Sequence, residues 1–429
     1  MKTVLAVVAV VLIVGVVVLG WGRDTPPLQV VHDALPPPAP LDSGQGFLFG
    51  RVTALDGATY EGRLRWGDGA EAFWGDYFNG VKRENVWARL VSPERLPTES
   101  RPLSIFGVEL ARRQRPRDLG RSFMARFGDL ARVEARGNEV RVTLKSGAVF
   151  DLDRFAASDF DDGVRVWDAT RGVVDLDSGR IRAIEFLPAA PIDGAPGRLH
   201  GTVRARRGQF TGFVQWNRTQ CLGTDELRGR TADGEIGLRF DSIRSIERSG
   251  DDSVVTLVDG RQIGLAEIVG GAGHRGVYVD DARYGRVLVS WDAFERLELS
   301  PAGSGPGYDE FPAGGPIFGS VTSRADRQLA GRLVYDLDES EITETLDAPL
   351  EGVDYTIPFG SIASIETASG TVTLVGGEVV RLERRGDLGE ANAGVLVIVE
   401  GQEGPAYLPW TEIERVDLRP LWPLRPRAD

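Results

Sequence analysis

Short stretches in which apolar and polar residues alternate make up most of the chain. Between residues 253 and 300, the segments SVVTLVDG, RQIGLAEI, RGVYVDD, GRVLVSW and ERLELS alternate in this way, with turn residues between them. Alternation with a period of two places successive side chains on opposite faces of a β-strand. We find no long helical period beyond the first residues of the chain. The pattern therefore predicts an all-β fold.

Two phrases recur three times in the same order, as is typical of internal repeats. Their consensus is Phe-x-x-Ile-x-x-Ile-Glu followed by Val-Thr-Leu-x-x-Gly. A packing position must occur in every copy of one fold, whereas a functional residue need occur only once. We therefore predict that the apolar positions of the first phrase, such as Phe240, Ile243 and Ile246, are core residues. The phrases are FGDLARVE and VTLKSG at 127–134 and 142–147, FDSIRSIE and VTLVDG at 240–247 and 255–260, and FGSIASIE and VTLVGG at 359–366 and 372–377.

A pair of glycines opens each copy, and an aromatic residue follows the second glycine by four positions. Alternation on both sides of an intervening turn predicts a β-hairpin at this place. A closing phrase, Trp-x-x-Ile-x-x-Val at 410–416 in the last copy, resembles the first recurring phrase. Each copy is therefore predicted to consist of two related halves. The glycine pairs are Gly50 and Gly62, Gly201 and Gly212, and Gly319 and Gly331.

These markers predict three tandem repeats, which we name copy one (47–187, with an insertion), copy two (198–299) and copy three (317–418). Glycine- and proline-rich segments at 188–197 and 300–316 favour separately folded copies. Five short strands with a tight turn before the last make each half similar to the small barrels of Sm-like and SH3-like domains. That resemblance implies a fold and no activity. The predicted architecture is all-β, with two five-stranded barrel-like half-units per repeat, and a six-bladed β-propeller is the alternative.

The N-terminus has the pattern of a membrane segment. Residues 4–19 are almost wholly apolar, Lys2 precedes them, and Trp21 follows at a position that suits the membrane interface. The run is long and no Ala-x-Ala site follows, so we predict a transmembrane signal-anchor at 1–22, inserted through residues 4–22, with a cleaved signal peptide as the alternative. A proline-rich spacer occupies 23–46. We expect a single-pass protein of the inner membrane whose body lies in the periplasm.

Composition and motifs narrow the possible functions. The formal net charge of -13 is repelled by phosphate backbones, so nucleic acid is not an expected partner. The single cysteine, Cys221, cannot form an internal disulfide, and it has no histidine near it in sequence. The three histidines lack metal-ligand spacing, and no nucleotide-binding or nucleophile motif is present. We therefore predict no enzyme activity, no cofactor and no metal site.

One acidic turn leaves a metal alternative open. Asp159, Asp161 and Asp162 form the densest carboxylate cluster, and oxygen ligands of this kind suit calcium. The segment lacks the twelve-residue EF-hand pattern, and the repeats place a turn at this position. A solvated acidic turn is the simpler interpretation.

The most unusual stretch is WGDGAEAFWGDYFNGVK at 66–82, because aromatic residues lie among acids and amides. The surrounding phrase YEGRLRWGDGAEAFWGDYFNG resembles sequences of uncharacterised exported bacterial repeat proteins, and this resemblance implies no activity. Such residues are typical of sugar-binding sites and protein hot spots, and also of ordinary core packing. We consider a binding or scaffold protein that engages an envelope protein partner, and alternatively binding or hydrolysis of envelope polysaccharide. The candidate surface residues are Trp66, Glu71, Trp74, Asp76, Tyr77 and Asn79.

Overall fold

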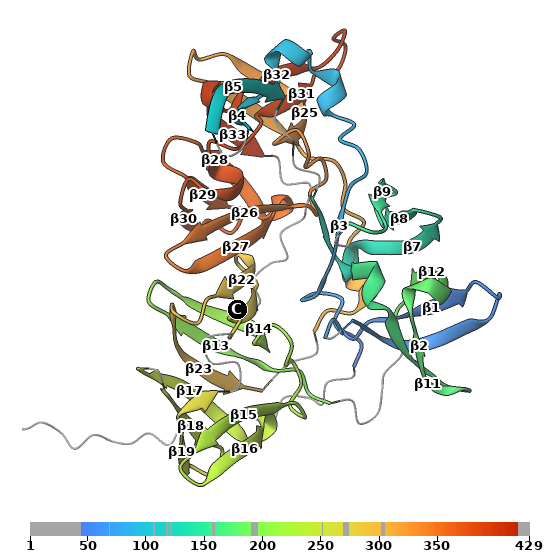
Figure 1. The fold of residues 1–429 in the computed structure, drawn as a ribbon, viewed down its shortest axis with the longest axis vertical. Coiled ribbons are helices and arrows are strands. Elements are labelled where there is room, and N and C mark those ends of the chain that lie inside the picture. The colour runs from blue at the N-terminus through green and yellow to red at the C-terminus, as the bar shows by residue number, and fades with distance from the viewer. Residues whose placement is uncertain are drawn as a thin grey trace, which may run out of the picture. The chain divides into compact units, whose positions relative to one another are not determined.

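The computed structural model describes residues 44–418 except 68, 106–107, 117–118, 120–121, 157–158, 190–195, 251, 269–273 and 302–304. The described part is all-β, with antiparallel sheets and short 3-10 turns (Figure 1). The predicted anchor at 1–22 and most of the spacer at 23–46 lie outside the described residues. A search of the described residues finds no helix that is both long and apolar enough to cross a bilayer.

Copy one forms an eight-stranded sheet with the order β11-β10-β2-β1-β12-β7-β8-β9. Two two-stranded sheets accompany it: β3 (Tyr77–Val81) pairs with β6 (Ser122–Arg126), and β4 (Thr98–Ile105) pairs with β5 (Val108–Pro116) within the insertion. The sheet consists of β1 (Phe49–Ala54), β2 (Thr59–Trp66), β7 (Leu130–Arg136), β8 (Glu139–Leu144), β9 (Val149–Asp153), β10 (Val164–Asp168), β11 (Gly172–Leu176) and β12 (Ile181–Phe186).

Copy two follows the same plan, with the order β22-β21-β14-β13-β23-β17-β18-β19. A separate small sheet is formed by β15 (Glu226–Thr231), β16 (Gly234–Arg239) and β20 (Glu267–Ile268). The main strands are β13 (His200–Ala205), β14 (Gln209–Trp216), β17 (Ile243–Ser249), β18 (Asp252–Leu257), β19 (Gln262–Leu265), β21 (Val277–Asp281), β22 (Gly285–Val289) and β23 (Phe294–Ser300).

Copy three has the order β32-β31-β25-β24-β33-β28-β29-β30, which again matches copy one strand for strand. Its additional hairpin consists of β26 (Thr345–Leu350) and β27 (Val353–Pro358). The main strands are β24 (Phe318–Ser323), β25 (Gln328–Tyr335), β28 (Ile362–Glu366), β29 (Thr371–Leu374), β30 (Val379–Arg381), β31 (Val395–Ile398), β32 (Ala406–Leu408) and β33 (Ile413–Leu418).

The predicted glycine hairpins are confirmed, and the structure explains why glycine recurs. In all three copies the two glycines lie directly opposite each other, as Gly201 and Gly212 do between β13 and β14. A Cβ atom on Gly201 would lie 2.3 Å from Glu298 O of β23, and one on Gly212 would lie 1.9 Å from Asp280 O of β21. The absence of both side chains therefore lets strands approach closely on either side of the hairpin.

The strand order within each sheet shows that the predicted half-units are wrong. In copy two, β13 and β14 of the first half lie between β23 and β21 of the second half, and β17 lies between β23 and β18. Strands of the two halves are thus interleaved, and they do not form two self-contained five-stranded sets. The three main described sheets contain eight, ten and eight strands, so they also differ from the four-stranded blades of a propeller.

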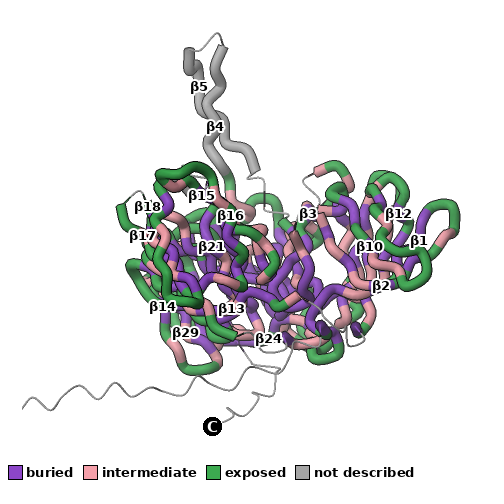
Figure 2. Tube along the Cα trace, turned by 90° about the horizontal axis from the view of Figure 1, so that it is seen from below, coloured by how far each residue is buried: buried purple, intermediate pink, exposed green. Residues whose placement is uncertain are grey.

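The recurring phrases occupy equivalent places in the core, as predicted. Each phenylalanine begins a 3-10 turn, namely η3 (Phe127–Asp129), η6 (Phe240–Ser242) and η9 (Phe359–Ser361), and a strand follows each turn. Figure 2 shows that buried residues run through the strands of the described chain. The apolar positions of the phrases are all buried: Phe127, Leu130 and Val133; Phe240, Ile243 and Ile246; Phe359, Ile362 and Ile365.

The copies are not separate domains, which corrects the expectation drawn from the linkers. Strand β22 of copy two pairs with β27 of copy three, so ten strands form one continuous sheet. Copies two and three also share one hydrophobic core. The exposed edge of β22 provides backbone groups that β27 satisfies, and this pairing was not visible in the local pattern.

The segment between copies two and three packs against copy one. Tyr308 and Phe311 are buried in the core of copy one, and the Tyr308 hydroxyl donates to Leu130 O at 2.7 Å. The Lys145 ammonium lies 3.5 Å from the centroid of the Tyr308 ring. The described part of 300–316 therefore connects the copies by packing, although its glycine and proline content is typical of a spacer.

Candidate functional site

Five of the six predicted surface residues are buried, so the proposed open aromatic surface is wrong. Trp66, Glu71, Trp74, Asp76 and Tyr77 are each at most 8% exposed. Only Asn79 is exposed, and its backbone N–H and side-chain amide donate to Asp159 Oδ2 at 2.8 and 2.9 Å. Trp74, Asp76 and Tyr77 lie where copy one packs against copy two, and they serve as contact residues between the copies. The other three residues make their contacts within copy one.

Asp76 is the centre of this contact. Its Oδ2 accepts the backbone N–H groups of Glu71 at 2.7 Å and Ala72 at 2.8 Å. Its Oδ1 accepts a hydrogen bond from the Gln215 amide of copy two and lies 3.5 Å from an Arg286 nitrogen. Glu71 is in turn paired with two arginines of β2. These carboxylates are fully engaged inside the protein and are not available to a sugar.

The aromatic rings pack in the same contact. The Trp74 ring lies 3.8 Å from the Phe213 ring of copy two, and the Arg198 guanidinium lies 4.9 Å from the Trp74 ring. The Arg286 guanidinium lies 4.5 Å from the Tyr77 ring. Such cation–π contacts and ring contacts stabilise buried surfaces.

Trp66 lies inside copy one. Its indole N–H donates to Asp159 O at 2.7 Å, and its ring packs against Phe78 and Phe127 with centroid distances of 5.3 Å. Asp159 belongs to the 3-10 turn η4 (Asp159–Asp162). The aromatic stretch is thus core and interface, which was the ordinary interpretation of its composition.

The role of Asp76 recurs in the other copies, although the sequence interpretation missed it. Asp225 Oδ2 accepts the N–H groups of Cys221 and Leu222, at 2.8 and 2.9 Å. Glu344 Oε2 accepts those of Ser340 and Glu341, at 2.7 and 3.0 Å. In each copy a carboxylate nine or ten residues after the aromatic end of the hairpin closes a loop. That spacing could have predicted the carboxylate that closes the loop in each copy.

The acidic turn at 159–162 is engaged by neighbouring groups. Asp159 accepts both hydrogen bonds from Asn79, and Asp161 Oδ1 accepts one from the Ser178 hydroxyl at 3.2 Å. Within the described ranges, no three His, Cys, Asp or Glu side chains are grouped so that they could hold a metal ion. The described contacts fit an acidic turn tied to its own loops.

Cys221 is buried, and burial raises the pKa of its thiol to about 12. The thiol therefore stays protonated at neutral pH, where a nucleophilic role would need the thiolate. Its position next to Phe47 and Leu222 is that of a small hydrophobic residue.

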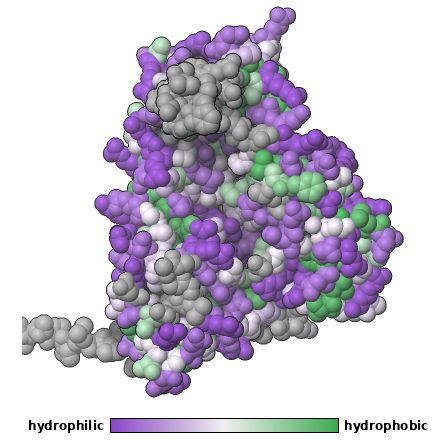
Figure 3. Space-filling model, viewed as in Figure 1, coloured by the Kyte–Doolittle hydropathy of each residue, from purple (hydrophilic) through white to green (hydrophobic). Residues whose placement is uncertain are grey.

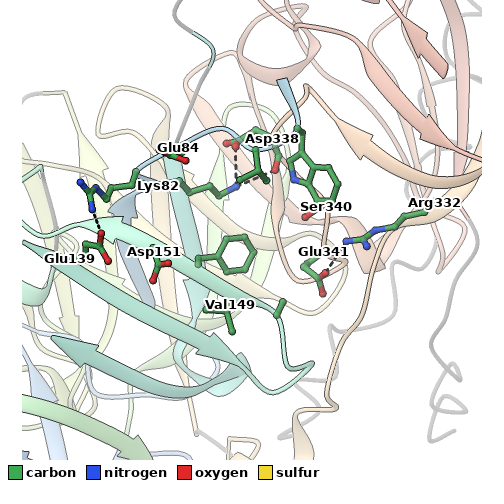
Figure 4. A pocket seen from close by; sticks show the side chains of 14 residues that line it. Lys82, Glu84, Glu139, Val149, Asp151, Arg332, Asp338, Ser340 and Glu341 are labelled. Carbon is green, nitrogen blue, oxygen red and sulfur yellow. Dashed lines mark hydrogen bonds and ion pairs between the residues drawn. The ribbon is translucent and has the colours of Figure 1, made fainter. Parts of the chain in front are cut away.

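A cavity of about 540 Å³ lies between copy one and copy three and was not predicted from the sequence (Figure 4). The segment after β3, the edge strand β9, the strand β25 and the loop before β26 line it. Volumes of this size are typical of ligand sites. Its lining residues are Lys82, Arg83, Glu84, Val86, Trp87, Glu139, Ala148, Val149, Phe150, Asp151, Arg332, Asp338, Ser340 and Glu341.

One end of the cavity is fixed by a buried lysine. The Lys82 Nζ atom lies 2.7 Å from Glu344 Oε1 and 3.2 Å from Asp338 Oδ1. Burial lowers the pKa of Lys82, but the carboxylates of Glu344 and Asp338 outweigh burial and raise it. Lys82 therefore remains charged and holds copy one against copy three.

The opposite wall contains a buried acid. The side chain of Glu341 is 6% exposed, and its Oε1 lies 3.6 Å from Arg332 Nη2. Its Oε2 atom has no hydrogen-bond partner among the described residues. Burial raises the pKa of Glu341, while Ser146 and Arg332 oppose the shift. Figure 4 shows Glu341 and Arg332 side by side at the cavity wall. An unsatisfied buried acceptor beside a cavity favours a ligand that donates a hydrogen bond.

Comparisons with protein-family models, with curated proteins and with solved structures find no match for the chain.

Proposed function

We propose that this chain is a non-catalytic binding and scaffold protein of the bacterial cell envelope that engages a protein partner through the cavity between copies one and three. In this proposal, residues 4–22 anchor the chain in the inner membrane and the spacer holds three tandem repeats in the periplasm. The observation that carries the proposal is the cavity, where exposed apolar side chains lie beside buried acidic ones.

The surface chemistry supports a protein partner. Val86 and Val149 line the cavity and are 53% and 51% exposed. The face seen in Figure 3 is mostly hydrophilic. Apolar residues in a concave site with a few polar groups are typical of recognition sites.

An unpartnered carboxylate oxygen in the cavity favours a basic partner segment. Five acidic side chains line it against three basic ones, and each acid lies within ion-pair distance of a base, Glu84 and Asp151 with Arg89 and Arg141 outside the lining. The buried Glu341 Oε2, which has no hydrogen-bond partner among the described residues, would accept a hydrogen bond from a Lys or Arg side chain of the partner.

The repeat architecture supports the scaffold part of the proposal. The three sheets share one strand order, and the same carboxylate-closed loop occurs in each copy. Repetition adds surface without adding catalytic groups. The polysaccharide hypothesis is weaker, because the rings and acids on which it depended are buried inside copy one or at the contact between copies one and two.

Photocrosslinking tests the proposal. A photoreactive amino acid replaces Val149, which lines the cavity, or Val258, a matched control that is 54% exposed elsewhere in copy two. We expect one envelope protein to be captured from position 149 and not from position 258. Equal capture at both positions, or no capture at position 149, would contradict the proposal.

The proposed location has its own test. A reporter that is active only in the cytoplasm, fused after Asp429, should remain silent, whereas a periplasm-active reporter should give signal. The opposite pair of results would rule out the proposed topology.

A further inference from the structure

The segment that follows the last strand has the composition of a ligand for this cavity. Residues 419–429, RPLWPLRPRAD, contain three arginines and one aspartate, within a chain of net charge -13. Proline stands at every third position, at 420, 423 and 426. A polyproline II helix has three residues per turn, so such a sequence favours that extended form and aligns the prolines along one edge.

The same period separates the three arginines into two groups. Arg419, Trp422 and Arg425 fall on one edge of a polyproline II helix, whereas Arg427 falls on another edge together with Leu424. The first edge would present a tryptophan between two guanidinium groups, and successive residues of this edge are about 9 Å apart along the axis. Aromatic-lined grooves recognise segments of this type.

The described chain stops close to the cavity. Leu418 of β33 lies opposite Gly319, and Gly319 lies opposite Gly331 of β25. Two strand spacings separate Leu418 from Gly331, which is about 10 Å. Arg332, the next residue of β25, lines the cavity. Eleven residues in polyproline II form extend roughly 34 Å, so residues 419–429 can reach the cavity from the same chain.

An exposed apolar side chain, Phe318, lies between the end of β33 and the cavity residue Arg332. Phe318 lies opposite Arg332 in the ladder, so both side chains are on the same face of the sheet. Phe318 is 38% exposed, one of few large hydrophobic residues with that exposure. It stands in the ladder row next to the one that contains Leu418.

The cavity offers matching groups. Trp87 and Phe150 provide aromatic surface, and Glu341 Oε2 lacks a hydrogen-bond partner among the described residues. A guanidinium donates hydrogen bonds to carboxylates more strongly than neutral donors do.

We infer that residues 419–429 bind in the cavity of their own chain and compete there with the protein partner. Competition rests on the proposed function, whereas binding of the segment rests on the cavity alone. The segment would keep the cavity filled until a partner segment of similar chemistry displaces it.

Peptide binding tests the inference. A fluorescent peptide RPLWPLRPRAD is titrated into the soluble region 42–429 and into the same region truncated after Leu418. We expect the peptide to bind the truncated protein and to bind the full-length region roughly tenfold more weakly, because the tethered segment competes at high effective concentration. No binding to the truncated protein would overturn the inference.

Matched variants test the geometry. In the full-length region, Arg425→Ala should release the cavity and strengthen peptide binding toward the truncated level, whereas Arg427→Ala should leave it nearly unchanged. In the truncated protein, Glu341→Gln should weaken peptide binding roughly tenfold, the effect expected for loss of a charged hydrogen bond. Equal effects of Arg425→Ala and Arg427→Ala would contradict the proposed edge.

Two further outcomes separate the alternatives. If the segment binds within its own chain, the difference in peptide affinity between the truncated and the full-length region should not depend on protein concentration. A difference that grows with protein concentration, together with dimer formation, would show that the segment binds a second copy. If the peptide does not bind but position 149 still captures a partner, the inference fails and the proposed function survives. If the peptide binds and no partner is captured, the proposed function fails alone.

Discussion

Lys82 and Glu344 form a buried ion pair across 262 residues of sequence, with 2.7 Å between Nζ and Oε1. The two side chains are 8% and 5% exposed. Lys82 directly follows β3 of copy one, and Glu344 closes the recurring loop of copy three by accepting two backbone N–H groups. The pair therefore connects a residue outside the recurring phrases to a residue that the repeat requires.

Lys82→Met should destabilise the protein strongly. The substitution leaves the buried carboxylates of Asp338 and Glu344 without their cation, and such a loss costs about 3–5 kcal/mol. Urea unfolding of the soluble region measures the change in the free energy of unfolding. A change close to zero would show that the pair does not hold copies one and three together.

An exposed ion pair provides the control. Arg165 and Asp175 are paired at 2.7 Å on the surface of copy one, with side chains 45% and 67% exposed. Arg165→Met should change the free energy of unfolding by less than about 1 kcal/mol, because solvent screens exposed pairs.

The sequence was sufficient for the fold class and for much of the core. Alternation with a period of two predicted strands, and the recurrence of Phe240, Ile243 and Ile246 predicted buried positions, because every copy of a fold needs the same packing. The glycine pairs predicted hairpins for a related reason, since close strand approach excludes a side chain wherever it occurs.

The order of strands and the contacts between copies could not be predicted in this way. Pairing of β22 with β27 joins two strands of different copies that are far apart in the sequence, and no local pattern encodes that pairing. The prediction of a surface site was wrong for a similar reason. Trp74 and Asp76 look like a surface site in one copy, but Phe213 and Gln215 of copy two cover them. The cavity itself is made by segments more than 180 residues apart.

Ile243→Ala should destabilise copies two and three together. Ile243 is 3% exposed in a core that both copies share, and truncation of a buried isoleucine costs about 2–5 kcal/mol. Hydrogen exchange with mass spectrometry should show faster exchange in β17 and also in β26 and β27. Faster exchange confined to copy two would instead favour separately folded copies, as the linkers alone suggested.

Trp74→Ala should lower the melting temperature of the soluble region. The ring packs on Phe213 and beside Arg198, and removal of a buried tryptophan costs about 3–5 kcal/mol. Asn79→Ala is the control in the same stretch, because the Asn79 side chain is exposed and contributes one side-chain hydrogen bond. An unchanged melting temperature in Trp74→Ala would restore the surface-site interpretation.

Asp280 should make stability depend on pH in the neutral range. It is buried beside Arg286, with 3.8 Å between Oδ1 and Nε. Burial raises the pKa of Asp280 from 3.8 to about 7, Arg286 opposes the shift, and Asp76 adds to it. Between about pH 4 and about pH 7, Asp280 keeps a proton in the folded state that it has lost in the unfolded state. The contribution of Asp280 is therefore complete below about pH 4 and is lost as the pH rises through about 7.

Asp280→Asn should remove this dependence, because an amide does not titrate. We expect the melting temperature of the unsubstituted protein to fall, relative to that of Asp280→Asn, as the pH rises from about 5 to about 8. Comparing the two proteins cancels the titration of groups that they share. Asp175→Asn is the control. The hydrogen bonds with Arg165 lower the pKa of Asp175, so this carboxyl group titrates in the acid range. The substitution should therefore leave the change of melting temperature with pH around neutrality unaltered. If Asp280→Asn and the unsubstituted protein had parallel profiles, the buried carboxyl group would be ionised throughout, held by Arg286 and its neighbouring arginines.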